Sequence, residues 1–123
     1  MSVLDFVNLY VADAEKSVGL YNQLLGTKPV SASPAFAMYV LPNGLKFGLW
    51  ARSDVQPPAA GTGGAEICFA VDGDAAVAPA LDAWKKLGLD IIQQPTKMGF
   101  GLTFTAEDPD GNRLRLFAPS QRG

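Results

Sequence analysis

Two residue types that carry much protein chemistry are scarce in this chain. Among its 123 residues there is no histidine and only one cysteine, Cys68. The lack of histidine removes the commonest metal ligand and the commonest general acid or base near neutral pH. One cysteine permits no disulfide within the chain, and residues 1–6 lack the basic and apolar segments of a signal peptide. The sequence therefore predicts a protein of the reducing cytoplasm.

Blocks of like charge and long apolar runs are also missing. The ten Lys and Arg residues are scattered, and 12 Asp and Glu residues give a net charge of −2. That balance argues against nucleic acid and against an anionic membrane surface as partners. No apolar run approaches the roughly 20 residues that span a bilayer. We also find no phosphate-binding loop, catalytic triad or zinc-ligand spacing, so a small molecule is the expected partner.

The chain does contain an internal repeat. Residues 6–13 match residues 66–73 in their apolar pattern, and a helical stretch follows each copy, at 13–25 and 74–87. Each helical stretch starts with an aspartate, Asp13 or Asp74, which suits an N-cap. Each ends in Leu-Gly, and a glycine commonly ends a helix. The repeat predicts a strand followed by a helix in both halves.

The second part of each half matches more sharply. Residues 42–50 align without gaps on residues 109–117, and both begin with a tight-turn sequence, Pro-Asn-Gly or Pro-Asp-Gly. Strands should lie on both sides of each turn. The strands before the turns, and one further strand in each half, are expected at 36–41, 102–106, 29–33 and 89–94.

The predicted fold class is therefore α+β. Two tandem βαβββ units each form an open, curved mixed sheet, or half-barrel, with the helix on the outer face. We place the first repeat at about 3–51, a Pro- and Gly-rich linker at about 52–64 and the second repeat at about 65–119, all within one domain spanning 1–123.

Strand alternation separates the two faces of each sheet. One set of alternate residues is mostly aliphatic and should face the helices. The other set mixes aromatic, small, amide and charged groups, so that face is either solvated or lines a ligand cavity. The repeat adds Phe36 and Met38 to this face, although both also suit an ordinary core. Its other members are Phe6, Asn8, Tyr10, Lys46, Gly48, Trp50, Glu66, Cys68, Ala70, Arg113, Arg115 and Phe117.

Several of these segments resemble a known family. The turn at 108–112, and the strand at 9–13 followed by Ser17, Tyr21 and Leu-Gly at 25–26, are similar to segments of the vicinal-oxygen-chelate superfamily. This superfamily includes glyoxalases, bleomycin-resistance proteins and extradiol dioxygenases. The resemblance extends from about residue 3 to residue 119 and implies the same βαβββ repeat. It also implies a homodimer, because members with two units per chain commonly pair again.

The resemblance also identifies where metal-using members carry their four His, Glu or Gln ligands. The corresponding residues here are Phe6, Gly48, Glu66 and Arg115. Phe and Gly have no ligand atom, and Arg keeps its proton, so only Glu66 suits a metal. We therefore expect no metal or other cofactor. The resemblance is strongest to metal-free proteins that bind antibiotics, among them the phenazine-resistance type.

In a protein of this type, Trp50 is the expected platform for a flat ligand. Gly48 has no side chain and should leave open space beside the indole. Phe6 and Phe36 should close the other side of this slot. Trp50 could instead plug the barrel mouth or contact a second copy. Glu66 and Arg115 could pair to anchor a polar ligand or only to satisfy each other. Phe100, between two glycines, belongs to a lid or to a plain loop. The predicted ligand-binding residues are Phe6, Asn8, Phe36, Met38, Gly48, Trp50, Glu66, Phe100 and Arg115.

Three functions compete at this point. The first is stoichiometric sequestration of a small planar aromatic compound, with no catalytic residue. The second is an enzyme of the same superfamily, of lyase, isomerase or dioxygenase type, that uses Glu66 as acid or base with a pKa tuned by Arg115. The third is an interaction protein without a pocket. Cys68 has no histidine partner and is expected to be a small buried hydrophobe.

Overall fold

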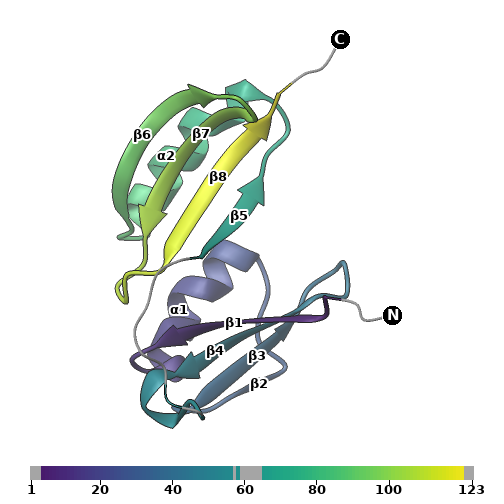
Figure 1. Cartoon of the computed structure of the whole chain (residues 1–123), viewed down its shortest axis with the longest axis vertical. Coiled ribbons are helices and arrows are strands. Elements are labelled where there is room, and N and C mark those ends of the chain that lie inside the picture. Colours follow the sequence, from purple (N-terminus) through teal and green to yellow (C-terminus); the bar gives the residue numbers. More distant parts are fainter. Residues whose placement is uncertain (1–3, 57, 59–64, 121–123) are drawn as a thin grey trace. The chain divides into compact units, whose positions relative to one another are not determined.

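The computed structural model describes residues 4–56, 58 and 65–120. The chain divides into two compact units, Met1–Gly61 and Thr62–Gly123, each with one sheet and one α-helix (Figure 1). The expected linker at 52–64 begins with a short 3₁₀ helix, η1 (Arg52–Asp54). Its residues 57 and 59–64 lie outside the described part of the chain.

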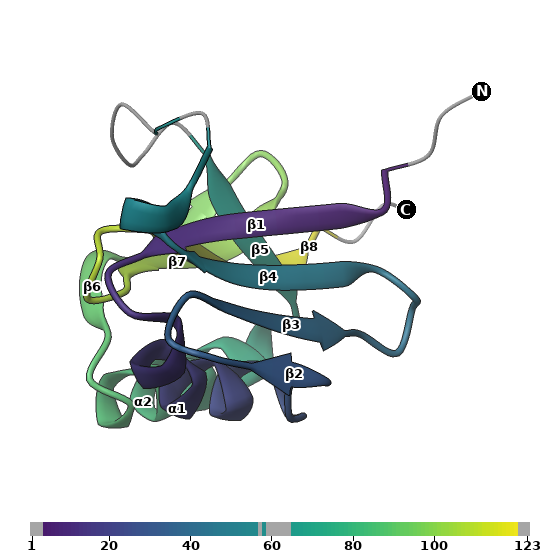
Figure 2. The same ribbon diagram turned by 90° about the horizontal axis from the view of Figure 1, so that it is seen from below.

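The first unit follows the predicted βαβββ order. Its elements are β1 (Phe6–Val11), α1 (Ala14–Leu25), β2 (Ser31–Ala32), β3 (Phe36–Val40) and β4 (Lys46–Ala51). The strands lie in the order β1-β4-β3-β2, as Figure 2 shows, with β1 parallel to β4 and the other neighbours antiparallel. Helix α1 packs on β3 and β4, so one face of this sheet is free of its own helix.

The ends of α1 are the ones that the sequence predicts. The carboxylate of Asp13 accepts hydrogen bonds from the backbone N–H groups of Glu15 (2.9 Å) and Lys16 (3.2 Å), as an N-cap does. Gly26 ends the helix at φ 68°, a conformation that glycine adopts without strain. On the buried side of the helix, the ring of Tyr21 lies 5.6 Å from that of Phe47 on β4. This contact anchors the helix to the sheet.

The second unit repeats the order. Its elements are β5 (Glu66–Ala70), η2 (Asp74–Ala76), α2 (Val77–Lys86), β6 (Asp90–Met98), β7 (Gly101–Glu107) and β8 (Arg113–Pro119). The strands are arranged as β5-β8-β7-β6, with β5 parallel to β8 and the other neighbours antiparallel. In the core, the ring of Trp84 on α2 makes a T-shaped contact with Phe104 on β7, at 5.1 Å between ring centroids. The predicted α+β class with two βαβββ units is therefore confirmed.

The predicted start of the second helix is wrong. Asp74 lies in the 3₁₀ turn η2, and the N-cap of α2 is Ala76, whose side chain makes no capping bond. Alanine has no side-chain acceptor for the N–H groups of the first turn, and Pro79, the third residue of α2, has no N–H that would need one. The Asp74 carboxylate instead lies 3.2 Å from the ammonium of Lys97.

Two strands differ in length from the prediction. Strand β2 has two residues, whereas β6 has nine and contains two register shifts, between Ile91 and Gln93 and between Gln93 and Thr96. Pro95 falls in the second shift of this edge strand, where a missing N–H is tolerated. Met98 pairs with Gly101, so residues 99–100 form a tight hairpin turn between β6 and β7. No helix in the described ranges is long and apolar enough to cross a membrane.

Candidate ligand-binding site

The helix-free face of the first sheet gathers the predicted site residues of that unit. Gly48 on β4 pairs with Asn8 on β1 and with Met38 on β3. Trp50, two residues further along β4, pairs with Tyr10 on β1 and with Phe36 on β3. Strand alternation therefore predicted the membership of this face correctly. We call it the aromatic face, and its residues are Phe6, Asn8, Tyr10, Phe36, Met38, Gly48 and Trp50.

The rings of the aromatic face form one contiguous cluster. Tyr10 and Phe36 each pack against the indole of Trp50 in a T-shaped arrangement, with ring centroids 6.4 and 6.2 Å apart and interplanar angles of 77° and 83°. Phe6 continues the cluster, 6.3 Å from Phe36. All four rings are half-buried. They present a partly accessible aromatic surface on one side of the sheet.

The space predicted beside Trp50 is filled. A β-carbon on Gly48 would overlap the side-chain oxygen of Asn8 and would lie 3.0 Å from two ring atoms of Phe36. Gly48 is itself buried. The prediction of an open slot at Gly48 is therefore wrong, because the side chains of its two neighbouring strands close over it. The accessible surface of this face is formed by the half-buried rings around Gly48.

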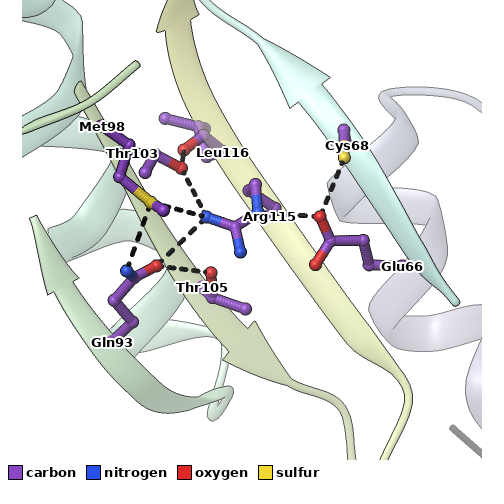
Figure 3. A network of polar contacts seen from close by, with 8 residues as sticks. All are labelled: Glu66, Cys68, Gln93, Met98, Thr103, Thr105, Arg115 and Leu116. Atoms are coloured by element: carbon purple, nitrogen blue, oxygen red, sulfur yellow. Dashed lines mark hydrogen bonds and ion pairs between the residues drawn. The ribbon is translucent and has the colours of Figure 1, made fainter. Parts of the chain in front are cut away.

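In the second unit the predicted Glu66–Arg115 pair is present, within a larger polar network (Figure 3). Arg115 Nε donates to Glu66 Oε1 at 2.8 Å, and Nη1 donates to Gln93 Oε1 at 3.1 Å and to Thr103 Oγ1 at 3.2 Å. Thr105 Oγ1 also donates to Gln93 Oε1, at 2.8 Å. The side chain of Arg115 is only 15% exposed, so its guanidinium is held firmly.

A second group of contacts covers Arg115. Phe100, in the hairpin turn between β6 and β7, places its ring 5.6 Å from the guanidinium carbon of Arg115, within reach of a cation–π interaction. The same ring packs edge-on against Phe117 at 5.9 Å. Met98 Sδ lies 3.9 Å from Arg115 Nη1. Phe100 thus lies against the guanidinium of Arg115.

Electrostatics within the network fix the charge of Glu66. The hydrogen bond from Arg115, assisted by the charge of that guanidinium, holds the pKa of Glu66 below its usual value. Partial burial and the nearby Glu66 carboxylate raise the pKa of the Cys68 thiol, which lies 3.6 Å from Glu66 Oε1. Cys68 is exposed on the edge strand β5, so the expectation that it is buried is wrong. At neutral pH Glu66 is a carboxylate and Cys68 a thiol.

The residues at the four metal-ligand positions do not fit a metal ion. Phe6 and Gly48 offer no ligand atom, and the guanidinium of Arg115 is a donor that occupies the single carboxylate, Glu66. Within residues 4–56, 58 and 65–120, no three His, Cys, Asp or Glu side chains lie close enough together to hold a metal ion. The residues at these positions therefore do not support chemistry at a bound metal.

Comparisons with known proteins agree with this fold. The model of the Glyoxalase/Bleomycin resistance protein/Dioxygenase superfamily matches residues 3–116. A phenazine antibiotic resistance protein of Enterobacter agglomerans is 25% identical over 111 residues, covering 88% of this chain and 85% of that protein. An NMR structure of an Agrobacterium tumefaciens protein is 48% identical, with a TM-score of 0.91 over 98% of this chain and 100% of that one. A glyoxalase-related enzyme from Fulvimarina pelagi, 22% identical with a TM-score of 0.83 over 96% of this chain and 88% of that one, shares the fold.

Proposed function

Because this chain belongs to the Glyoxalase/Bleomycin resistance protein/Dioxygenase superfamily, we propose that it is a metal-free binding protein that sequesters a small planar aromatic compound. The compound is an antibiotic or a related metabolite, and the protein acts in the cytoplasm. The similarity to a phenazine antibiotic resistance protein supports this class of ligand. The observation that carries the proposal is the aromatic face of the first sheet.

The aromatic face suits a flat, unsaturated molecule. Trp50 makes T-shaped contacts with Tyr10 and Phe36, an arrangement in which the positive edge of one ring meets the negative face of another. A planar ligand laid against these half-buried rings gains about 0.5–1.5 kcal/mol per ring pair beyond the burial of area. Asn8, whose exposed side chain lies over Gly48 among these rings, offers its amide N–H groups to a ring nitrogen or carbonyl of the ligand.

The residues of the second unit favour binding over catalysis. Glu66 was the candidate acid or base, but a carboxyl whose pKa lies below its usual value carries no proton to donate at neutral pH. Its Oε1 atom also accepts hydrogen bonds from Arg115 and Cys68. The chain has no histidine to replace it. Sequestration requires none of these groups to transfer a proton.

Calorimetric titration with phenazine tests the proposal. Protein dialysed against a chelator should bind about one phenazine per chain, and chromatography should recover the compound unchanged. Tetradecahydrophenazine, the saturated and puckered analogue, should bind far more weakly because it cannot stack and its amines are protonated. Binding that requires an added divalent metal, or conversion of phenazine to a product, would contradict the proposal.

A further inference from the structure

The second unit contains a hollow of about 310 Å³ on the helix-free face of its sheet. Its lining residues are Ile92, Gln93, Thr105, Arg113 and Arg115. We propose that this hollow, which we call the arginine pocket, binds the carboxylate of a small organic acid with an apolar substituent. The inference concerns the second unit alone and does not depend on aromatic binding in the first.

Arg115 is positioned in advance for such a ligand. Glu66 fixes its Nε, and Gln93 and Thr103 fix its Nη1. Within the described residues no hydrogen bond is made by Nη2, and Figure 3 shows this second terminal nitrogen without a contact. Its two N–H groups therefore remain as donors. A guanidinium that is already ordered loses little further entropy when it binds an anion.

Arg113 supplies the positive charge that the pocket needs. It lies two residues before Arg115 on β8, so both side chains leave the same face of the sheet. Glu66 and Glu107 are its cross-strand neighbours, yet in the described part of the chain Arg113 makes no ion pair within 4.0 Å and no side-chain hydrogen bond. Because Glu66 already balances Arg115, the guanidinium of Arg113 is the charge available to an incoming anion.

The other walls select the kind of anion. Ile92 gives the pocket an apolar side and is 39% exposed. The hydroxyl of Thr105 is already committed to Gln93, and the Gln93 amide nitrogen donates to the sulfur of Met98, at 3.6 Å, and to no other residue that the structure describes. A thioether is a weak acceptor, so this amide can turn to a stronger one. Two guanidinium groups and an amide beside an isoleucine suit a carboxylate with a short hydrocarbon substituent.

Nuclear magnetic resonance titration of the full chain with isobutyrate tests the assignment. Isobutyrate should shift the backbone amide signals of Gln93, Thr105 and Arg115 in a saturable way. Isobutyramide, which has the same shape without the charge, should not. Because isobutyrate has no ring, this result is independent of aromatic binding at Trp50, whose indole signal should stay in place. Equal binding of isobutyramide or of inorganic phosphate, or shifts confined to the first unit, would overturn the inference.

Substitutions test whether the charge of Arg113 contributes to isobutyrate binding. Arg113→Gln should weaken isobutyrate binding about tenfold, the loss expected for one charge-assisted hydrogen bond. Lys86→Gln, the same change of charge at an exposed position in the last turn of α2, is the control and should leave the affinity unchanged. Ile92→Asp, which places a negative charge in the pocket, should abolish binding. If Arg113→Gln and Lys86→Gln bind alike, or Ile92→Asp still binds, the pocket is not the carboxylate site.

Discussion

The side-chain oxygen of Asn8 lies over Gly48, at a place where a β-carbon on Gly48 would overlap it. The two residues are partners in the parallel ladder of β1 and β4. The absence of a side chain at Gly48 therefore serves the packing of Asn8 and of Phe36, whose ring also lies above it. This packing holds the aromatic face together, because Phe36 in turn contacts Trp50 and Phe6.

Gly48→Ala should accordingly destabilise the protein. Overpacking of a filled site costs about 1–3 kcal/mol of unfolding free energy, measurable by urea denaturation. Gly19→Ala is the matched control, because nothing lies within 4 Å of its β-carbon position on α1, and alanine there should stabilise the helix by about 0.5–1 kcal/mol. Adding Asn8→Ala to Gly48→Ala should recover part of the loss. A Gly48→Ala variant as stable as the parent would show that the site is not filled.

The contact between Glu66 and Cys68 predicts how the thiol reacts. Burial and the Glu66 carboxylate raise the thiol pKa, so less thiolate is present at a given pH. Glu66→Gln removes the negative charge and should lower the thiol pKa. Alkylation by iodoacetamide should then become faster near pH 8 and converge with the parent at high pH, where both are thiolates. Cys68 is the only cysteine, so the rate reports this site alone. Identical pH profiles would contradict the electrostatic account.

Much of this fold follows from short-range rules that act along the chain. The alternation of strands β1, β4, β5 and β8 places Phe6, Asn8, Trp50 and Arg115 on the predicted faces because those ladders run without a shift. The two Pro-Asx-Gly turns connect β3 to β4 and β7 to β8, which fixes which strands are neighbours. The Glu66–Arg115 pair was predictable for the same reason.

The features that sequence analysis missed depend on contacts between chain segments. Gln93 joins the Arg115 network from β6. Two register shifts interrupt this strand, so the face on which Gln93 lies could not be predicted from strand alternation. The space at Gly48 was misjudged because it is filled from neighbouring strands, by Asn8 and Phe36, and not by adjacent residues of the chain. Strand alternation predicts on which face of the sheet a side chain lies. It does not predict how far the side chains of neighbouring strands extend over that face.

The purified protein should contain no stoichiometric divalent metal. At the four positions where metal-using members carry ligands, this chain has Phe6, Gly48, Glu66 and Arg115, and the last two are paired with each other. Elemental analysis after dialysis should find far less than one Zn, Mn, Fe or Ni per chain. A Glu66→Gln variant, which removes the single carboxylate, should give the same result. About one metal per chain in the parent and none in the variant would refute the metal-free account.

We expect the protein to be a homodimer. The ground is the family, because members of this superfamily with two βαβββ units per chain commonly pair again. Light scattering at micromolar concentration should give a particle of twice the chain mass of 13.0 kDa. A dilution series separates a stable dimer from weak association. A particle that stays at the mass of one chain throughout the series would argue against this expectation.

The most direct test of the central claim is the affinity of phenazine for a protein with and without Trp50. Trp84 is only 6% exposed in the core of the second unit, so a Trp84→Phe background leaves Trp50 as the single fluorescent indole. Phenazine should quench its fluorescence with a micromolar or lower dissociation constant. Calorimetry should show that Trp50→Ala, made in the parent, weakens binding by about 1–3 kcal/mol while the protein stays folded. If Trp50→Ala binds phenazine as tightly as the parent, or if the indole of Trp50 is not quenched, the aromatic face is not the binding site.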